Sequence, residues 1–301
     1  MPASSKLARL QRWAPLGLLA AAIAAGVLLW PWSPIGAVIV ALLIAFLHAG
    51  VLALEFLMLR LATRDDPAPK PSLRQLVSAW AREVVDDAVV FGWRQPFDWR
   101  REPDRLEGAP GTTGIVFIHG FVCNRGFWTP WLRQARARGH AFVAVNLEPV
   151  FCSIDGYSRI IDEAVQAVTR ATGRPPLLVC HSMGGLAARA WLRHDGGRTR
   201  VAHVVTIGTP HRGTWIARFS RLPNGRQMRV GCDWLNALPG AEPDAARLFT
   251  CWYSNCDNIV FPPSTATLPA ADNRFLEGAA HVDLAFRPAV VEHTFALAAR
   301  L

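Results

Sequence analysis

The chain has 301 residues, 51% of them hydrophobic, and a formal net charge of +9 at pH 7. Once an apolar N-terminal region of about 60 residues is set aside, this length leaves material for one domain with a substantial core. The positive charge comes from scattered arginines and follows no nucleic-acid-binding module, so we expect no nucleic-acid partner. The densest group of basic residues consists of Arg94, Arg100, Arg101 and Arg105. This group could bind an anionic phospholipid surface, and the alternative is an ordinary solvated face.

Two long apolar runs dominate the N-terminal region. Residues 14–30 form the first, and residues 35–59 form the second, which is interrupted only by His48 and Glu55. Because a membrane-spanning helix needs about 20 apolar residues, both runs predict transmembrane helices, and the tryptophan–proline turn between them predicts a hairpin. Residues 1–64 are therefore interpreted as a membrane anchor, and His48 and Glu55 receive no catalytic role.

Basic residues flank this hairpin on both sides. Lys6, Arg9 and Arg12 precede the first run, Arg60 and Arg64 follow the second, and the loop between the runs carries no charge. Positively charged flanks normally stay on the cytoplasmic side of a membrane. The sequence therefore predicts an inner-membrane protein with two spans, whose remaining residues lie on the cytoplasmic side.

An alternative is that the first run is a signal peptide. It follows a basic segment and contains the small-residue tract 22–24, which is typical of a cleavage site. Cleavage there would leave one anchor and reverse the orientation of the remaining chain. The cysteines would then be candidates for disulfide bonds, whereas in a cytoplasmic domain we expect reduced thiols.

Residues 65–111 connect the anchor to the following domain. A proline-rich break at residues 67–71 is followed by apolar residues at helical spacing from Ser72 to Phe91, with Ser72 as the N-cap. We expect this helix to pack on the following domain or to lie at the lipid surface. The stretch after it, through residue 107, is expected to form an irregular edge.

Ser182 occupies a strand-to-helix corner. The apolar run 177–179 leads into Cys-His-Ser-Met-Gly-Gly, where a sharp turn would present the serine hydroxyl to a base. Gly184 and Gly185 would let the following helix pack close to the sheet. The pattern G-x-S-x-G has Cys180 in place of its first glycine, and cysteine is near the upper size limit there. The neighbouring His181 lies on the strand and is expected to point away from the nucleophile.

Two more segments complete a recognisable pattern. Residues 114–118 predict a buried strand that ends in His-Gly-Phe, and residues 200–207 predict another strand that runs into the turn 208–214. With the serine corner, these segments resemble the lipase and esterase branch of the α/β-hydrolase family, close to bacterial triacylglycerol lipases and lipid-anchor deacylases. The resemblance covers about residues 112–300.

The resemblance implies a fold and a set of site residues. The fold is an α/β-hydrolase domain over residues 112–301, with a mostly parallel sheet and helices on both faces. We expect a shortened sheet, because the two strands that open many such domains are not evident before residue 114. The residues implied for the oxyanion loop and the cleft rim are His119, Gly120 and His211, and those implied as backbone oxyanion donors are Phe121 and Met183.

The same family implies a triad in the chain order serine, acid, histidine. Residues 248–254 predict a strand, and Asp257, which follows it, is the expected acid. His281 lies in a loop that resembles the family's histidine loop and is the expected base. The rival acids, none of which follows a strand-like run, are Asp233, Asp244 and Asp272. No histidine pair has the spacing of a zinc hydrolase, so we expect no metal ligands and no cofactor.

The insertion at residues 214–247 is apolar and rich in prolines and glycines. In lipase-like proteins this region forms a lid over the acyl site, and the alternative is an ordinary packed helical cap. The sequence as a whole predicts a membrane-tethered hydrolase of lipid-like carboxylic esters that forms an acyl-enzyme on Ser182. An acyltransferase or thioesterase with the same triad is one alternative, and a non-catalytic membrane scaffold is another.

Overall fold

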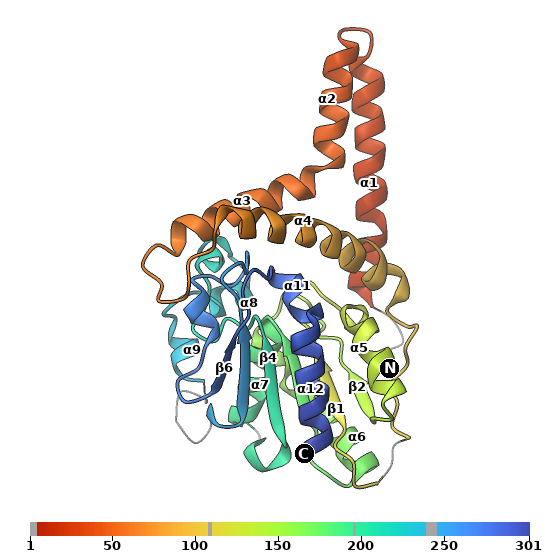
Figure 1. The fold of residues 1–301 in the computed structure, drawn as a ribbon. Helices are drawn as coiled ribbons and strands as arrows, with labels where there is room; N and C mark the ends of the chain where they lie inside the picture. Colours follow the sequence, from red (N-terminus) through yellow and green to blue (C-terminus); the bar gives the residue numbers. More distant parts are fainter. Residues whose placement is uncertain (1–4, 108–109, 195–196, 239–245) are drawn as a thin grey trace.

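The computed structural model describes residues 5–107, 110–194, 197–238 and 246–301. Figure 1 shows an α/β domain beneath a group of N-terminal helices, two of which rise from it as a hairpin. We call residues 112–301 the α/β domain and residues 5–98 the N-terminal helices.

Six parallel strands form one sheet in the order β2-β1-β3-β4-β5-β6. The strands are β1 (Ile115–Ile118), β2 (Phe142–Ala144), β3 (Leu177–His181), β4 (His203–Ile207), β5 (Phe249–Tyr253) and β6 (Asp272–Phe275). The strand order reverses between β1 and β3, and in open parallel sheets ligands bind at the carboxyl ends of the strands beside such a reversal. The four strands expected from apolar runs are confirmed, whereas β2 and β6 were not predicted.

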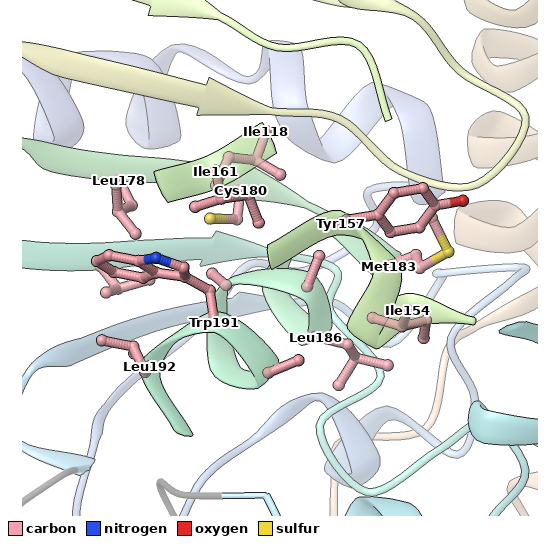
Figure 2. Close-up of a cluster of buried hydrophobic side chains, with 14 of the residues drawn as sticks. Ile118, Ile154, Tyr157, Ile161, Leu178, Cys180, Met183, Leu186, Trp191 and Leu192 are labelled. Atoms are coloured by element: carbon pink, nitrogen blue, oxygen red, sulfur yellow. The ribbon is translucent and has the colours of Figure 1, made fainter. Parts of the chain in front are cut away.

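Helices cover both faces of the sheet because the strands alternate their side chains. Val116 and Ile118 of β1 face one core cluster, and Ile115 and Phe117 face another. The first cluster lies under α6 (Ser158–Thr172) and α7 (Met183–His194), and Figure 2 shows its side chains between α7 and β3. The second lies under α5 (Thr129–Ala137) and α12 (Pro288–Arg300). Short elements between these are η2 (Arg125–Trp128), η3 (Ile154–Tyr157), η4 (Gly197–Arg200), η6 (Pro263–Ala266) and α11 (His281–Phe286).

The hairpin consists of α1 (Lys6–Leu29) and α2 (Pro34–Ala45). Among the described residues, α1 is the one helix that is long and apolar enough by itself to cross a membrane. The predicted second span, 35–59, is not one helix. It breaks at Phe46, and α3 (Leu47–Ala62) continues at an angle of 63° to α2.

The break has a physical cause in the packing of α3. Instead of following α2, this helix lies across the α/β domain (Figure 1) and buries Leu52, Phe56 and Leu59. Phe56 and Leu59 share a buried cluster with Cys256 and Phe261 of the α/β domain. A run that is apolar enough for lipid is thus partly used as protein core, which hydropathy alone does not distinguish.

The helix predicted after the proline-rich break is present as α4 (Leu73–Val89), and Ser72 is its N-cap as expected. Ser72 and Gln75 form a capping box, in which each side chain accepts a hydrogen bond from the other residue's backbone N–H. Next to α3, α4 crosses the top of the domain in Figure 1, and Trp80 Nε1 donates to the carbonyl oxygen of Ala49 at 2.9 Å. A π-helix, η1 (Val90–Asp98), follows directly.

The insertion expected to form a lid contains η5 (Trp215–Phe219), α8 (Pro223–Gln227) and α9 (Asp233–Asn236). Ala217, Met228 and Leu235 are buried in the core cluster under α7. Residues 239–245 of the predicted lid lie outside the described residues. The described part of the insertion is packed against the domain, as in the alternative interpretation of this segment.

Candidate active site

Ser182 stands at the corner between β3 and α7. Its φ angle is +53°, in the left-handed region that non-glycine residues rarely occupy. A Cβ atom on Gly184 would lie 2.5 Å from the carbonyl oxygen of Ile118, and one on Gly185 would lie 2.3 Å from Thr209 Oγ1. Helix α7 therefore approaches the sheet so closely that both positions require glycine.

Cys180 replaces the first glycine of the expected pattern. Its side chain is fully buried in the core cluster of Figure 2, and it pairs in the sheet with Ile118 and Thr206. The thiol thus occupies core volume and leaves the space around Ser182 open. Like the other five cysteines, it is a free thiol.

The glycine turn after β1 lies against Ser182. A Cβ atom on Gly120 would be 2.8 Å from the Cβ atom of Ser182. Phe121, the first predicted oxyanion donor, follows in this turn and lines the cavity beside the serine. Met183, the second predicted donor, is the first residue of α7, where backbone N–H groups have no partner inside the helix. Both candidate donors therefore belong to the segments that surround Ser182.

His119 supports this turn from the protein interior. It is 1% exposed, its Nδ1 donates to the carbonyl oxygen of Gly120 at 2.9 Å, and its Nε2 accepts from the backbone N–H of Leu147 at 3.0 Å. Burial lowers the pKa of His119 to about 4, so the ring is neutral at physiological pH. His119 shapes the turn but does not line the cavity.

Asp257 and His281 form a buried pair. His281 Nδ1 lies 2.9 Å from Asp257 Oδ1 and 3.0 Å from Oδ2. The aspartate is held in place because Oδ1 also accepts from the backbone N–H groups of Ile259 at 3.0 Å and Val260 at 2.7 Å. Gly208 passes so close that a Cβ atom there would lie 2.9 Å from Asp257 Oδ2. The sequence-predicted acid and base are therefore direct neighbours.

The rival acids are placed elsewhere. Asp272 begins β6, is exposed, and pairs with Arg274 at 2.7 Å. Asp233 begins α9, and Asp244 lies outside the described residues. His281 is therefore paired with Asp257 rather than with either of the described rivals.

Ser182 and His281 line one cavity of about 190 Å³ at the carboxyl ends of the strands. Within the part of the chain that the structure describes, the side chains of Ser182 and His281 form no hydrogen bond with each other. Hydrogen bonds between a nucleophile and its base are often long in the absence of substrate. Gly120 and Phe121 line the same cavity. The nucleophile, the base and one candidate oxyanion donor thus meet in a single space.

His181 differs from expectation. Instead of pointing away, it lines the cavity, with its ring centroid 4.6 Å from that of His281. It is stacked on Phe127 at 4.4 Å. Burial lowers its pKa well below the usual value, so the neutral ring uses Nε2 to donate to the carbonyl oxygen of His281 at 3.1 Å. His181 therefore supports the backbone of the candidate base.

The roof of the cavity comes from the N-terminal helices. Leu52 and Glu55 of α3, Glu83 and Asp87 of α4, and Phe91 of η1 all line it. In contrast, no residue in the described parts of the predicted lid does so. The described part of the expected lid segment therefore does not cover the cavity. The helices that cover a site are determined by tertiary packing, which local composition does not reveal.

Glu83 holds the loop of the candidate base. It is 1% exposed, and its two carboxylate oxygens accept from the backbone N–H groups of Val282 at 2.8 Å and Asp283 at 3.0 Å. These groups come directly after His281, at the start of α11. Sequence reasoning missed this residue, although one signal was present: Glu83 lies on the buried stripe of α4 with Leu76 and Ala79.

Glu55 makes a similar link to the acid loop. Its Oε2 accepts from Asn258 Nδ2 at 2.7 Å, and Asn258 Oδ1 accepts from the backbone N–H of His281 at 3.2 Å. Glu55, to which the sequence gave no catalytic role, thus connects α3 to the segments of both Asp257 and His281. The N-terminal helices therefore contact the site directly, through two carboxylates.

Burial changes the charge of this roof. It raises the pKa of Glu83 well above the ordinary glutamate value, and the nearby Asp87 adds to this rise. Burial and the proximity of Glu55 raise the pKa of Asp87 to about 7. At neutral pH the cavity therefore carries less negative charge than its number of carboxyl groups suggests.

His211 is not brought to the cavity. It is 1% exposed, its Nε2 bonds to Thr206 Oγ1 at 2.9 Å, and its carbonyl oxygen accepts from Arg189 at 2.8 Å. Burial lowers its pKa well below the usual value. This histidine braces the turn after β4 instead of forming the rim of the cleft.

A serine at a strand-to-helix corner, with a buried histidine–aspartate pair at the carboxyl ends of a parallel sheet, is the arrangement of the α/β-hydrolase class. The alpha/beta hydrolase family model matches residues 115–298, which is more than half of the chain. The chain belongs to this family.

Solved structures of two lipases are similar to the chain. One is the mature lipase BlEst2 of Bacillus licheniformis, at 17% identity and a TM-score of 0.55, covering 64% of this chain and 94% of that one. The other is lipase B of Aspergillus fumigatus, at 18% identity and a TM-score of 0.52, covering 60% of this chain and 51% of that one. At these identities the similarity establishes the fold.

Proposed function

We propose that the protein is a membrane-tethered serine hydrolase that cleaves lipid-like carboxylic esters. The observation that carries this proposal is the 2.9 Å contact between Asp257 and His281 in the cavity region that also contains Ser182 at its positive-φ corner. Family membership supports a hydrolase, and the two lipase structures are consistent with an ester substrate.

The reaction begins with attack on the ester carbonyl carbon. Ser182 Oγ forms the new bond while His281 Nε2 accepts its proton, and Asp257 holds Nδ1 and stabilises the imidazolium. Collapse of the tetrahedral intermediate expels the alcohol, which takes the proton from His281. Water then attacks the acyl-enzyme with His281 as base, releasing the carboxylic acid and restoring Ser182.

The tetrahedral oxyanion is stabilised by backbone N–H groups. Those of Phe121 and Met183 are the donors in this proposal, because they belong to the turn and helix start on either side of Ser182. A donor of this type contributes about 3 kcal/mol to the transition state. The helix N-terminus of α7 adds a favourable dipole for negative charge.

The substrate class follows from the cavity walls and the hairpin. Leu52, Phe91, Phe121, Val122 and Ile259 supply apolar surface around the nucleophile, which suits an acyl chain. The apolar helix α1, with α2 beside it, would hold the enzyme at a bilayer. By the charge of its flanks, the α/β domain would lie on the cytoplasmic side of the inner membrane.

The test is hydrolysis of p-nitrophenyl esters of increasing chain length by the full chain in detergent. We expect turnover that rises from acetate to medium-chain esters and disappears in Ser182→Ala. That variant should retain its unfolding temperature, since the side chain only becomes smaller. Equal hydrolysis by Ser182→Ala and the unmodified protein would contradict the proposed function.

A further inference from the structure

On helices α3 and α4, the charged and apolar residues are distributed in the opposite way from that of a helix on a water-exposed surface. Their charged residues Glu55 and Glu83 face the cavity, whereas large apolar side chains face outward. Six of these outward residues are between 48% and 60% exposed: Val51, Leu54, Leu57, Leu61, Val77 and Val85. A helix on a water-exposed surface shows the opposite pattern, and soluble monomers rarely expose apolar patches of this extent.

We propose that this outer face of α3 and α4 lies in the membrane interface, so that the cavity beneath receives its ester directly from the bilayer. The inference rests on the proposed function and specifies its substrate as an ester of a membrane lipid. We call the two helices together the roof layer.

The dimensions of the hairpin support a lipid as the occupant of this surface. Helix α2 has 12 residues, which corresponds to about 18 Å, whereas the hydrocarbon core of a bilayer is about 30 Å thick. Only Phe46 separates α2 from α3, so the roof layer begins where the apolar hairpin ends. A helix layer adds about 10 Å. The apolar height therefore matches a bilayer when the roof layer is immersed in the near leaflet.

Charged and aromatic residues at the edges of the roof layer fit the same placement. Arg60, Arg64 and Arg74 are exposed at the end farthest from the hairpin, where they would meet anionic headgroups. Trp13 is 71% exposed and Trp93 is 59% exposed, on α1 and η1. Tryptophan is enriched at the boundary between headgroups and hydrocarbon.

Helix α3 and the adjacent π-helix η1 lie between this surface and Ser182. Leu52 of α3 and Phe91 of η1 line the cavity of Ser182, while Leu54 and Leu57, a few residues along α3, face outward. One helix layer therefore separates the outer apolar face from the cavity of Ser182. In this proposal the acyl chain passes from the leaflet to the cavity without entering bulk water.

The test compares one soluble ester with one bilayer ester. Leu54→Asn with Leu57→Asn makes the outer face polar without changing any residue that lines the cavity. The matched control is Leu106→Asn, which is 44% exposed beside the bridge of Arg105 to Phe142, at the amino end of β2. Each protein is assayed in detergent with p-nitrophenyl butyrate, and in vesicles of three parts phosphatidylcholine to one part phosphatidylglycerol that contain a fluorogenic diacyl ester.

We expect the double variant to lose about tenfold in turnover of the vesicle ester, because the polar roof layer is drawn out of the interface. It should keep its activity on the soluble ester, and the Leu106 control should keep both activities. Unchanged turnover of the vesicle ester, or an equal loss on both substrates, would overturn the inference and leave the proposed function standing. A failure of the unmodified protein to cleave the soluble ester would overturn the proposed function, and the inference with it.

Discussion

The α/β domain and the N-terminal helices are both rich in apolar residues, yet they use them differently. In the domain, Trp128, Trp131 and Trp191 are fully buried, whereas Trp13 and Trp32 on the hairpin are 71% and 87% exposed. Helix α3 does both, burying one face in protein and exposing the other. An apolar composition thus indicates that burial of a segment away from water is favourable. It does not indicate whether the segment is buried by lipid or by protein.

The two regions also divide the candidate site between them. The domain supplies the candidate acid, base and nucleophile, and the N-terminal helices supply the roof and two carboxylates, Glu55 and Glu83, that hold the loops. Changes in the domain should therefore affect the chemical step most strongly. Changes in the helices should act more weakly, through the position of the candidate base or through stability.

The largest effect is expected from the acid and the base. Asp257→Asn should lower kcat by about 10⁴, because the imidazole loses the carboxylate that orients it. His281→Ala should be at least as damaging. Rates on a soluble p-nitrophenyl ester measure both effects, and Asp272→Asn serves as the matched control because that aspartate pairs with Arg274 in β6. A larger loss in Asp272→Asn than in Asp257→Asn would show that the assigned acid is wrong.

A smaller effect is expected from Glu83 on α4. Glu83→Ala removes both acceptors from the N–H groups after His281, so we expect kcat to fall by about 10- to 100-fold with little change in KM, as for other groups that orient a reacting residue. Glu83→Gln should be milder, since its amide oxygen still accepts one of the two bonds. Asp86→Asn on the same helix is the control for charge.

The outcomes for Glu83 separate positioning from a general effect on folding. A loss in kcat that Gln partly rescues fits positioning of His281. Equal losses in the Ala and Gln variants, accompanied by a lower unfolding temperature, would mean that Glu83 serves the fold alone.

The sequence predicts structure best where the signal is local. Strand β3 begins with the continuous apolar run 177–179, which marks it in the sequence. A short motif and chain order single out Ser182, Asp257 and His281, which lie together in the structure, and their catalytic roles stay predictions. The strand β6 has the polar sequence Asp-Asn-Arg-Phe and lies at a sheet edge, so no apolar run marks it. Edge strands are commonly polar and short.

The remaining differences arise from tertiary packing. The roof was expected from residues 214–247, and the second apolar run was expected to span a membrane as one helix. Both expectations were based on the composition of a single segment. In the structure, helix α3 packs against Phe261 and accepts a hydrogen bond from Asn258, which lie about 200 residues further along the chain. Neither contact has a signature near residue 55.

The smallest effect is expected from Asp87 on α4, and it concerns the stability of the folded protein instead of the reaction rate. Its pKa is raised to about 7, whereas an aspartate in an unfolded chain has a pKa of about 3.9. Between these pH values the unfolded chain releases the proton that the folded chain keeps, so this group lowers stability as pH rises from about 4 to about 7. Above pH 7 the penalty remains constant.

Asp87→Asn removes this penalty. We expect its unfolding temperature in detergent to exceed that of the unmodified protein by several degrees at pH 8 and to match it near pH 4, since each 1 kcal/mol of stability moves the unfolding temperature of a protein of this size by about 2–4 °C. Thermal unfolding at both pH values measures the difference. A variant that is less stable at pH 8 would indicate that the Asp87 carboxylate is stabilised, rather than penalised, by its surroundings.

The central claim is that Ser182 is an activated nucleophile, and covalent labelling tests it most directly. The full chain in detergent is treated with a fluorophosphonate, which phosphonylates a serine that is activated by a base beside an oxyanion pocket. Digestion and mass spectrometry should then locate one adduct on Ser182, and the His281→Ala variant should remain unlabelled. An adduct on a different serine, or no adduct on the unmodified protein, would contradict the account.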